Sequence, residues 1–260
     1  MARRRRWIGL AVLAVLLVLW FGLTTWTGLV STGRFPAPAD FWFSLVQITT
    51  RGYAGGQLFA HALHSLILVV VGFIVAIVTG VPIGLWMGWS RRAEAAINPV
   101  FLIIRPIPPL AWIPLAILWL GLGDAAKILV IWFAAFVPSV INSFAGVRTI
   151  DRPIIEASRM LGTPRWRFVI EVLAPAAAPM IFTGLRLSLQ AAWTTLVAAE
   201  LVGALVGLGF ILNVAQQDIY PGMILVGMVS VGILGFATTW LLGRIEQRTL
   251  SWNIAAGHGQ

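Results

Sequence analysis

Charged residues are scarce in this chain of 260 residues, and cysteine is absent. Asp, Glu, Lys and Arg make up 10% of the sequence, against roughly 25% in a typical soluble domain, while hydrophobic residues make up 59%. A chain this poor in charge cannot cover a water-facing surface, so most of its exterior must face lipid. The absence of cysteine excludes disulfides, thiolate zinc sites and cysteine nucleophiles.

Groups for catalysis are also missing from the sequence. It shows no Ser/His/Asp set, no paired carboxylates and no cluster of metal ligands. His61 and His64 share a helical face at i, i+3, but a metal site would need further ligands, and only Asp40 and His258 could supply them. We therefore expect neither an enzyme nor a resident metal or cofactor.

Basic residues exceed acidic ones, 18 Lys and Arg against 9 Asp and Glu, which gives a formal net charge of +9. In a soluble protein this excess would suggest nucleic acid as a partner. Here the arginines stand between long apolar runs, and such an excess is typical of the cytoplasmic loops of membrane proteins. We therefore expect contact with membrane lipid and none with nucleic acid.

Long apolar runs dominate the rest of the chain. A membrane-crossing helix needs about 20 mostly apolar residues. Suitable stretches lie at residues 7–33, 62–90, 101–121, 128–147, 176–199 and 219–243. The third contains several prolines, which neighbouring helices can accommodate inside a membrane by satisfying the freed carbonyls. The sequence therefore predicts an all-α polytopic membrane protein with about six transmembrane helices.

These spans divide the chain into regions. The regions are a basic segment with the first span at 1–30, an external loop at 31–61, a core of five spans at 62–250 with a cytoplasmic loop at 148–178, and a cytoplasmic tail at 251–260. A signal peptide is an alternative for the start, but the apolar run is too long and no convincing cleavage site follows. Residues 201–217 are short for a crossing, so we expect an external loop, a surface helix or a re-entrant helix there.

The distribution of basic residues predicts the orientation. Most Lys and Arg residues fall in segments that this topology places in the cytoplasm: Arg3 to Arg6, Arg91, Arg92, Arg148, Arg152, Arg159, Arg165, Arg167, Arg244 and Arg248. This bias places both termini inside. Arg105 and Arg186 lie at the inner ends of predicted spans, and we expect Arg186 to snorkel or to pair internally rather than bind a substrate.

The predicted cytoplasmic loop is unusual for a connection between spans. Its pattern predicts two helices separated by Gly162, with Thr163 able to cap the second helix and Pro164 at its first position. Such an elbow suits docking onto another protein, because the small residues Ala157 and Ser158 permit close approach and nearby arginines supply charge. A merely solvated loop is the alternative interpretation.

This loop resembles the EAA loop of ABC-importer permeases, whose pattern is E-A-A, three residues, G, nine residues and I-x-L-P. The matching residues are Glu156, Ala157, Gly162 and Pro175. The departures are Ser158, Val172 and Ala174, in place of the second alanine, the isoleucine and the leucine. Three further stretches, 105–124, 127–139 and 192–210, resemble the nitrate/sulfonate/taurine permeases. Within that group, their sequences are most similar to the taurine type.

The resemblance implies a role for the elbow, because in that family its short helix sits in a cleft of a separate ATPase subunit and transmits closure of that subunit. The residues assigned to this coupling are Glu156, Ala157, Ser158, Arg159, Leu161, Gly162 and Arg165. The implied partners are a second copy of the chain, two ATPase subunits and an external substrate-binding protein. Since Ala126 precedes Lys127, the only lysine, the chain has no G-x-x-x-x-G-K-[ST] phosphate loop, so ATP and Mg would bind the ATPase.

The resemblance also implies a function and a place. It implies a type I permease subunit of an ATP-driven importer in the cell inner membrane, which carries a small anion, with taurine or another alkanesulfonate as the expected substrate. Nitrate, bicarbonate, aromatic acids and vitamin precursors remain alternative substrates. An ATP-independent secondary transporter or channel, or a membrane enzyme, remains an alternative class.

Polar residues of the fifth predicted span are the candidates for a translocation path or gate. Gln190, Trp193, Thr194 and Thr195 lie within roughly two helical turns. Their polar groups either face a path or bond across helices as packing contacts. Glu200 closes an apolar run, where it either belongs to an outer gate or dimer seam, or lies in headgroups or water at a helix end.

Overall fold

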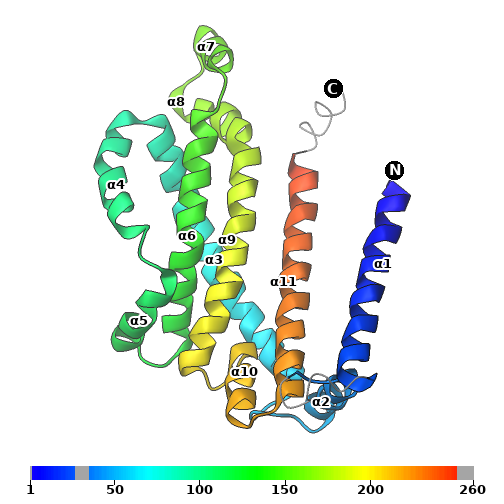
Figure 1. Cartoon of the computed structure of the whole chain (residues 1–260). Coiled ribbons are helices and arrows are strands. Elements are labelled where there is room, and N and C mark those ends of the chain that lie inside the picture. Colours follow the sequence, from blue (N-terminus) through cyan, green and yellow to red (C-terminus); the bar gives the residue numbers. More distant parts are fainter. Residues whose placement is uncertain (1, 27–34, 251–260) are drawn as a thin grey trace. The chain divides into compact units, whose positions relative to one another are not determined.

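The computed structural model describes residues 2–26 and 35–250, and within these ranges the regular elements are helices (Figure 1). The predicted all-α class is confirmed. The predicted tail and the end of the first predicted span lie outside the described residues. The chain forms two compact units, Met1–His64 with Leu205–Gly232, and Ser65–Ala204 with Ile233–Gln260.

The first unit gathers the two external-loop regions of the prediction. Its elements are α1 (Ala2–Phe21) with a π-helical turn (Gly22–Trp26), α2 (Pro38–Thr50), α10 (Leu208–Gln217), and the first turns of α3 (Leu58–Trp89) and α11 (Pro221–Thr249). Asp40 stabilises the start of α2, because its carboxylate accepts a 2.9 Å hydrogen bond from the amide of Ala37, the N-cap residue. Gly222 lets α11 approach α2 closely, since a Cβ there would lie 2.5 Å from the Ser44 hydroxyl oxygen.

The second unit holds the remaining helices. In chain order they are the rest of α3, α4 (Arg91–Ile104), a 3₁₀ turn (Pro109–Trp112), α5 (Ile113–Leu120), α6 (Asp124–Arg148), α7 (Arg152–Met160), α8 (Arg165–Arg167), a π-helical segment (Phe168–Leu173), α9 (Ala174–Gly203) and the rest of α11. Figure 1 shows α6 and α9 running side by side, with α7 and α8 beyond one end of them.

Close helix packing explains why small residues recur on α3 and α6. A Cβ at Gly84 would lie 2.5 Å from the Val140 carbonyl oxygen, and Gly80 and Gly88 face α6 in the same way. Between α6 and α9, the hydroxyls of Ser139 and Ser188 lie 2.8 Å apart. Small residues and hydroxyl bonds of this kind hold helices together in a membrane, where lipid is as apolar as the side chains.

Length and composition identify the described helices that can cross a membrane. Among the described residues, α3, α6, Phe168–Gly203 and α11 pass that test. Helix α4 and the segment Pro109–Leu120, bent by 84° from each other, pass it only as a pair, which makes them a broken span or a re-entrant loop. At the start of the chain, Leu17–Trp26 is a shorter apolar helix. The third predicted span is therefore wrong as a single helix, because its cluster of prolines removes backbone donors and interrupts the helix between Ile104 and Pro109.

Candidate functional site

The elbow between α6 and α9 has the predicted helix–glycine–helix form. Helix α7 begins at Arg152 and ends at Met160, and Gly162 follows with a φ of +64°. The Thr163 amide donates to the Ser158 carbonyl oxygen over 3.2 Å, which is the 6→1 bond of a Schellman motif. The left-handed φ of Gly162 turns the chain sharply from α7 toward α8. Glycine adopts this φ without strain, because it has no Cβ.

The tip of the elbow is unusually apolar for an exposed segment. Met160, Leu161 and Trp166 are 87%, 83% and 61% exposed. Glu156 and Ala157 are exposed as well, whereas Ser158 is buried and its hydroxyl donates to the Ile155 carbonyl oxygen over 2.7 Å. The side chains of Arg159 and Arg165 lie outside the described part. The exposed candidates thus form one surface, and Ser158 belongs to the inner side of the helix.

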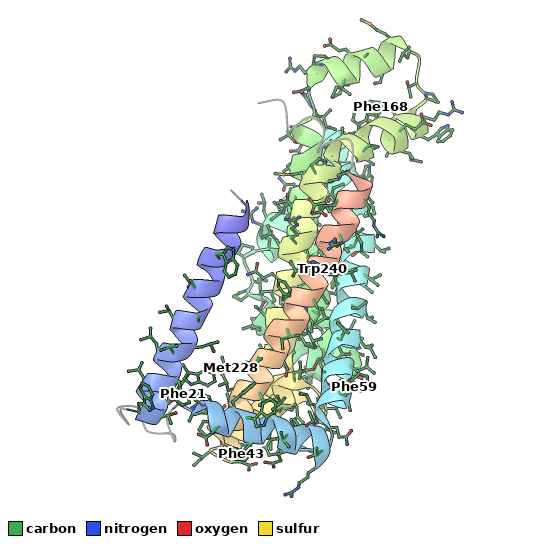
Figure 2. All side chains as sticks on the ribbon, turned by 90° about the vertical axis from the view of Figure 1, so that its right-hand side faces the viewer. Phe21, Phe43, Phe59, Phe168, Met228 and Trp240 are labelled. Atoms are coloured by element: carbon green, nitrogen blue, oxygen red, sulfur yellow. The ribbon has the colours of Figure 1, made fainter. Side chains whose placement is uncertain are left out.

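Packing at its base ties the elbow to the transmembrane helices. Phe168 is buried, and the centroid of its ring lies 4.4 Å from that of Trp89 at the end of α3. Phe168 also belongs to a buried cluster with Val147 of α6 and Ala177 of α9, against which Ile155 of α7 packs. Figure 2 shows Phe168 at the elbow, beside the ends of the long helices. A force on the elbow would therefore reach α3, α6 and α9 directly.

The four polar candidates on α9 divide into two faces. Gln190 and Thr194 are exposed, and the Thr194 hydroxyl donates to the Gln190 carbonyl oxygen over 3.2 Å. Trp193 and Thr195 are buried, and the Trp193 indole donates over 3.0 Å to the hydroxyl of Thr238 on α11. Gln190 and Thr194 therefore have accessible side chains, while Trp193 bonds across helices.

Glu200 is buried, with 1% of its surface exposed. It accepts a 2.7 Å hydrogen bond on Oε1 from the hydroxyl of Ser65 on α3. The interpretation of Glu200 as a helix-end residue in headgroups or water is therefore wrong for this side chain, since α9 continues to Gly203 and packs it inside. A carboxylate held between two membrane-crossing helices is a functional-site candidate.

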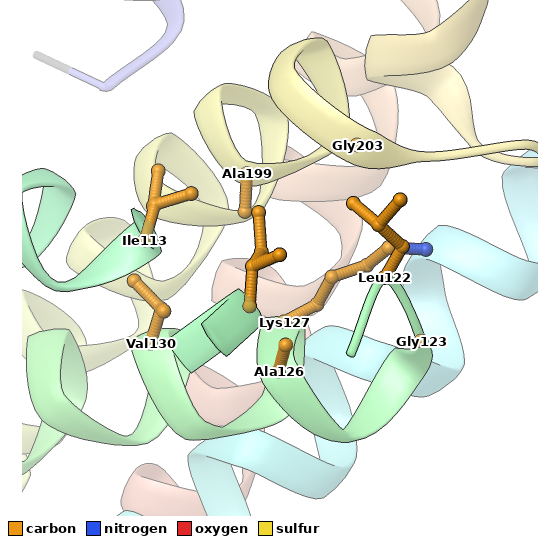
Figure 3. Close-up of a pocket in the computed structure, with 9 residues that line it drawn as sticks. Ile113, Leu122, Gly123, Ala126, Lys127, Val130, Ala199 and Gly203 are labelled. Atoms are coloured by element: carbon orange, nitrogen blue, oxygen red, sulfur yellow. The ribbon is translucent and has the colours of Figure 1, made fainter. Parts of the chain in front are cut away.

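A narrow crevice lies beside the end of α9 (Figure 3). It is lined by Ile113, Ala199 and Gly203, and by Lys127, which is 7% exposed and lies 3.1 Å from the Asp124 carboxylate. Its volume is about 10 Å³, which is room for one water at most. This crevice is too small for a transported solute.

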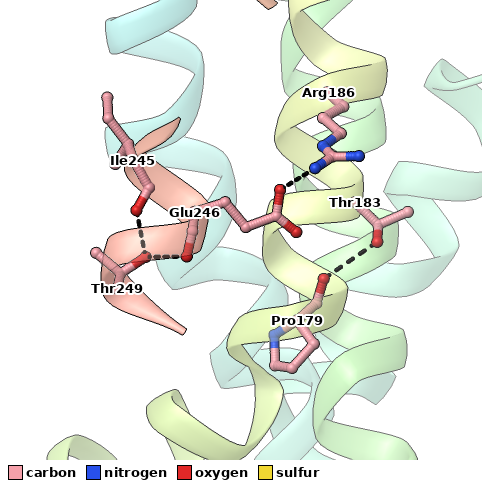
Figure 4. Close-up of polar contacts among 6 residues, drawn as sticks. All are labelled: Pro179, Thr183, Arg186, Ile245, Glu246 and Thr249. Atoms are coloured by element: carbon pink, nitrogen blue, oxygen red, sulfur yellow. Dashed lines mark hydrogen bonds and ion pairs between the residues drawn. The ribbon is translucent and has the colours of Figure 1, made fainter. Parts of the chain in front are cut away.

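Arg186 forms an ion pair with Glu246 of α11 (Figure 4). The expected internal pairing of Arg186 is therefore confirmed. The pair joins α9 to α11 near the end that bears the elbow, where the Thr183 hydroxyl also donates to the Pro179 carbonyl oxygen over 3.1 Å.

His61 and Tyr53 organise the first unit. The buried His61 accepts the Gly207 amide on Nδ1 over 3.0 Å, and its Nε2 lies 3.2 Å from the Tyr53 carbonyl oxygen. The Tyr53 hydroxyl donates to Asp218 over 2.5 Å. Burial raises the pKa of Tyr53 above its ordinary value, and the bond to Asp218 and its charge raise it further. These bonds tie the α2–α3 turn to the turns on either side of α10.

Comparison with known proteins gives consistent relatives. A family described as "Binding-protein-dependent transport system inner membrane component" matches residues 80–251. The taurine transport system permease protein TauC of Escherichia coli (strain K12) is 33% identical over 97% of this chain and 95% of its own length. The putative aliphatic sulfonates transport permease protein SsuC of Bacillus subtilis (strain 168) is 33% identical over 96% of this chain and 89% of its own.

Two further relatives belong to transport systems for other substrates. The bicarbonate transport system permease protein CmpB of Synechococcus elongatus is 33% identical over 82% of this chain and 80% of its own length. A chain of the MetNI methionine ABC transporter in an inward-facing conformation shares the fold, with a TM-score of 0.64 at 23% identity over 74% of this chain and 95% of that one. This chain therefore belongs to the family of binding-protein-dependent transport system inner membrane components, and is an ABC importer permease of the taurine, sulfonate and bicarbonate type rather than an enzyme.

Proposed function

We propose that two copies of this chain form the path by which an ATP-driven importer carries taurine or another alkanesulfonate across the cell inner membrane. Support for the substrate comes from TauC, a taurine transport permease, and SsuC, a putative aliphatic sulfonate transport permease, which are similar to this chain over more than nine-tenths of it. Bicarbonate is the second candidate, because CmpB is equally identical over a shorter stretch.

The elbow is proposed to couple the path to ATP hydrolysis. The observation that carries this proposal is the exposure of Met160, Leu161 and Trp166 on the elbow, whose base holds the buried Phe168. Large apolar side chains exposed outside the predicted spans favour a protein-binding site. Glu156, Ala157 and Gly162 flank it, and a groove on the ATPase subunit is the proposed receptor. Arg159 and Arg165 remain part of the predicted contact surface.

ATP and Mg are proposed to bind the partner ATPase subunits, since no phosphate loop exists in this sequence. The elbow would then lie in the cytoplasm with both termini, in agreement with the arginine bias. An external binding protein would deliver the substrate to the opposite side. Gln190, Thr194 and Glu200 remain the proposed path and gate residues of α9.

Reconstitution tests this proposal. The chain, its ATPase and its binding protein are assembled in proteoliposomes, and uptake of labelled taurine, methanesulfonate and bicarbonate is measured with and without ATP. We expect ATP-dependent uptake of the two sulfonates. Uptake of bicarbonate alone would assign the second substrate. Uptake without the ATPase would contradict the importer mechanism.

A further inference from the structure

Two cavities follow the face of α6 that lies against the broken span. The larger, of about 370 Å³, is lined by Asn98, Phe101 and Arg105 and by the part of α6 from Val140 onward. Its volume falls within the roughly 300–1,000 Å³ of small-molecule sites. The smaller, of about 150 Å³, is lined by the break itself and by residues 133–138 of α6. Arg105 is the lining residue that both cavities share.

Arg105 lies beside the middle of a membrane-crossing helix. Residues 133–138 are the central part of α6, which extends from Asp124 to Arg148. The sequence placed Arg105 at the inner end of a span, and that expectation is wrong because α4 begins at Arg91 and the span breaks after Ile104. A charge at membrane depth normally faces the bundle interior or a water-filled cavity.

The backbone at the break indicates the same environment. Pro106 and Pro108 interrupt the helix between Ile104 and Pro109, and the two pieces of the span are bent by 84°. Non-helical backbone at membrane depth is tolerated where it is buried in protein or lines a water-filled cavity. The break meets this condition, because its residues and Arg105 line the two cavities.

The two arginines of the larger cavity differ in their partners. Arg148 forms an ion pair with Glu94, and its guanidinium lies 5.2 Å from the centroid of the Phe144 ring. Its charge is therefore already compensated. Within the described part of the chain, the Arg105 guanidinium has no ion pair or side-chain hydrogen bond. The cavity thus presents one uncompensated guanidinium, from Arg105.

We propose that Arg105 is an oxyanion site of the translocation path, which holds the sulfonate of the solute as it passes the break between α4 and α5. A guanidinium donates two parallel N–H bonds to such a group, which a lysine cannot do. The Asn98 amide lines the same cavity and supplies a further donor. The identification of the ligand as a sulfonate rests on the proposed function. A lipid headgroup phosphate has the same chemistry, and the test separates the two sources.

Transport by three variants provides the first test. Arg105→Gln removes the charge, Arg105→Lys keeps the charge without the paired donors, and Arg92→Gln, at the exposed start of the same helix, is the matched control. Uptake of labelled methanesulfonate and ATP hydrolysis are measured for the full complex in phosphatidylcholine vesicles, with and without cardiolipin.

We expect Arg105→Gln to lower uptake by about tenfold or more, and Arg105→Lys to lower it less. Arg92→Gln should leave uptake unchanged. These results should be the same in vesicles with and without cardiolipin, and basal ATP hydrolysis should stay intact. Unchanged uptake by Arg105→Gln would overturn the proposal. A loss confined to cardiolipin vesicles would also overturn it, because the site would then belong to a lipid.

A binding measurement separates this inference from the proposed function. Because the chain has no cysteine, Ala145→Cys places a single thiol in the larger cavity. We expect methanesulfonate to slow the reaction of this thiol with a maleimide in the full complex, and Arg105→Gln to abolish the protection. Protection without sulfonate uptake would contradict the proposed function and keep the site. Sulfonate uptake without protection would keep the function and remove the site.

Discussion

The rings of Trp89, the last residue of α3, and Phe168, at the base of the elbow, pack with their centroids 4.4 Å apart and their planes at 35°. Trp89 is 39% exposed, whereas Phe168 is buried among residues of α6 and α9. This contact joins the surface proposed to meet the ATPase to three helices of the second unit. The proposed coupling through the elbow would use this contact.

Phe168→Ala should destabilise the chain by about 3–5 kcal/mol, the usual cost of removing a buried aromatic ring. Thermal unfolding of the purified chain measures this loss. Trp166→Ala is the matched control, since Trp166 lies two residues away and is 61% exposed. The control should keep the Tm and weaken binding to the ATPase. Equal Tm values for the two variants would contradict the assigned roles.

Gly84→Ala should disrupt the packing of α3 on α6, because the added methyl would lie 2.5 Å from the Val140 carbonyl oxygen. Overpacking of this kind costs about 1–3 kcal/mol. Gly232→Ala on α11 is the comparison, since a Cβ there meets nothing within 4 Å. The yield of folded protein and the Tm should fall for Gly84→Ala alone. A similar fall for both would point to a general effect of alanine.

Ser65→Ala should cost about 1–3 kcal/mol, because Glu200 would lose its 2.7 Å hydrogen bond inside the protein. A double-mutant cycle with Glu200→Gln measures the coupling between the two side chains. We also expect Glu200→Ala to reduce sulfonate uptake at normal levels of inserted protein. Additive effects in the cycle would show that the bond is unimportant, and full uptake by Glu200→Ala would remove it from the gate.

High pH should release the bond between Tyr53 and Asp218. Because the pKa of Tyr53 is raised in the folded chain, its protonated form contributes stability that is complete below the unfolded value of about 10 and is lost as pH rises above it. The Tm should therefore fall less steeply above about pH 10 for Tyr53→Phe than for the wild-type chain. Parallel Tm profiles for the two proteins would contradict this account.

Local patterns in the sequence were sufficient to predict the elbow and the helices α3, α6, α9 and α11. The turn at Gly162 is a local feature, and each of those helices has its own apolar run. The buried Glu200 accepts its hydrogen bond from Ser65, which lies 135 residues away, so no local pattern could reveal this contact.

The sequence predicts the broken helix only in part, but it is sufficient to predict the two faces of α9. The prolines predict an interruption of the third span, but neither its 84° angle nor the position of Arg105 beside the middle of α6. The division of the α9 candidates could have been predicted, because Gln190 and Thr194 are four residues apart and share one helical face.

Substitutions at Gly162 test whether the elbow couples ATP hydrolysis to transport. A Cβ at this position meets nothing within 4 Å, so a substitution acts through the φ of +64° alone. Asparagine tolerates this conformation and valine does not. The measurement is sulfonate-stimulated ATP hydrolysis by the full complex with Gly162→Asn and Gly162→Val. We expect near-normal stimulation for Gly162→Asn and its loss for Gly162→Val, with both proteins inserted in the membrane. Equal stimulation by both variants, or a wild-type chain that binds no ATPase, would contradict the proposed coupling.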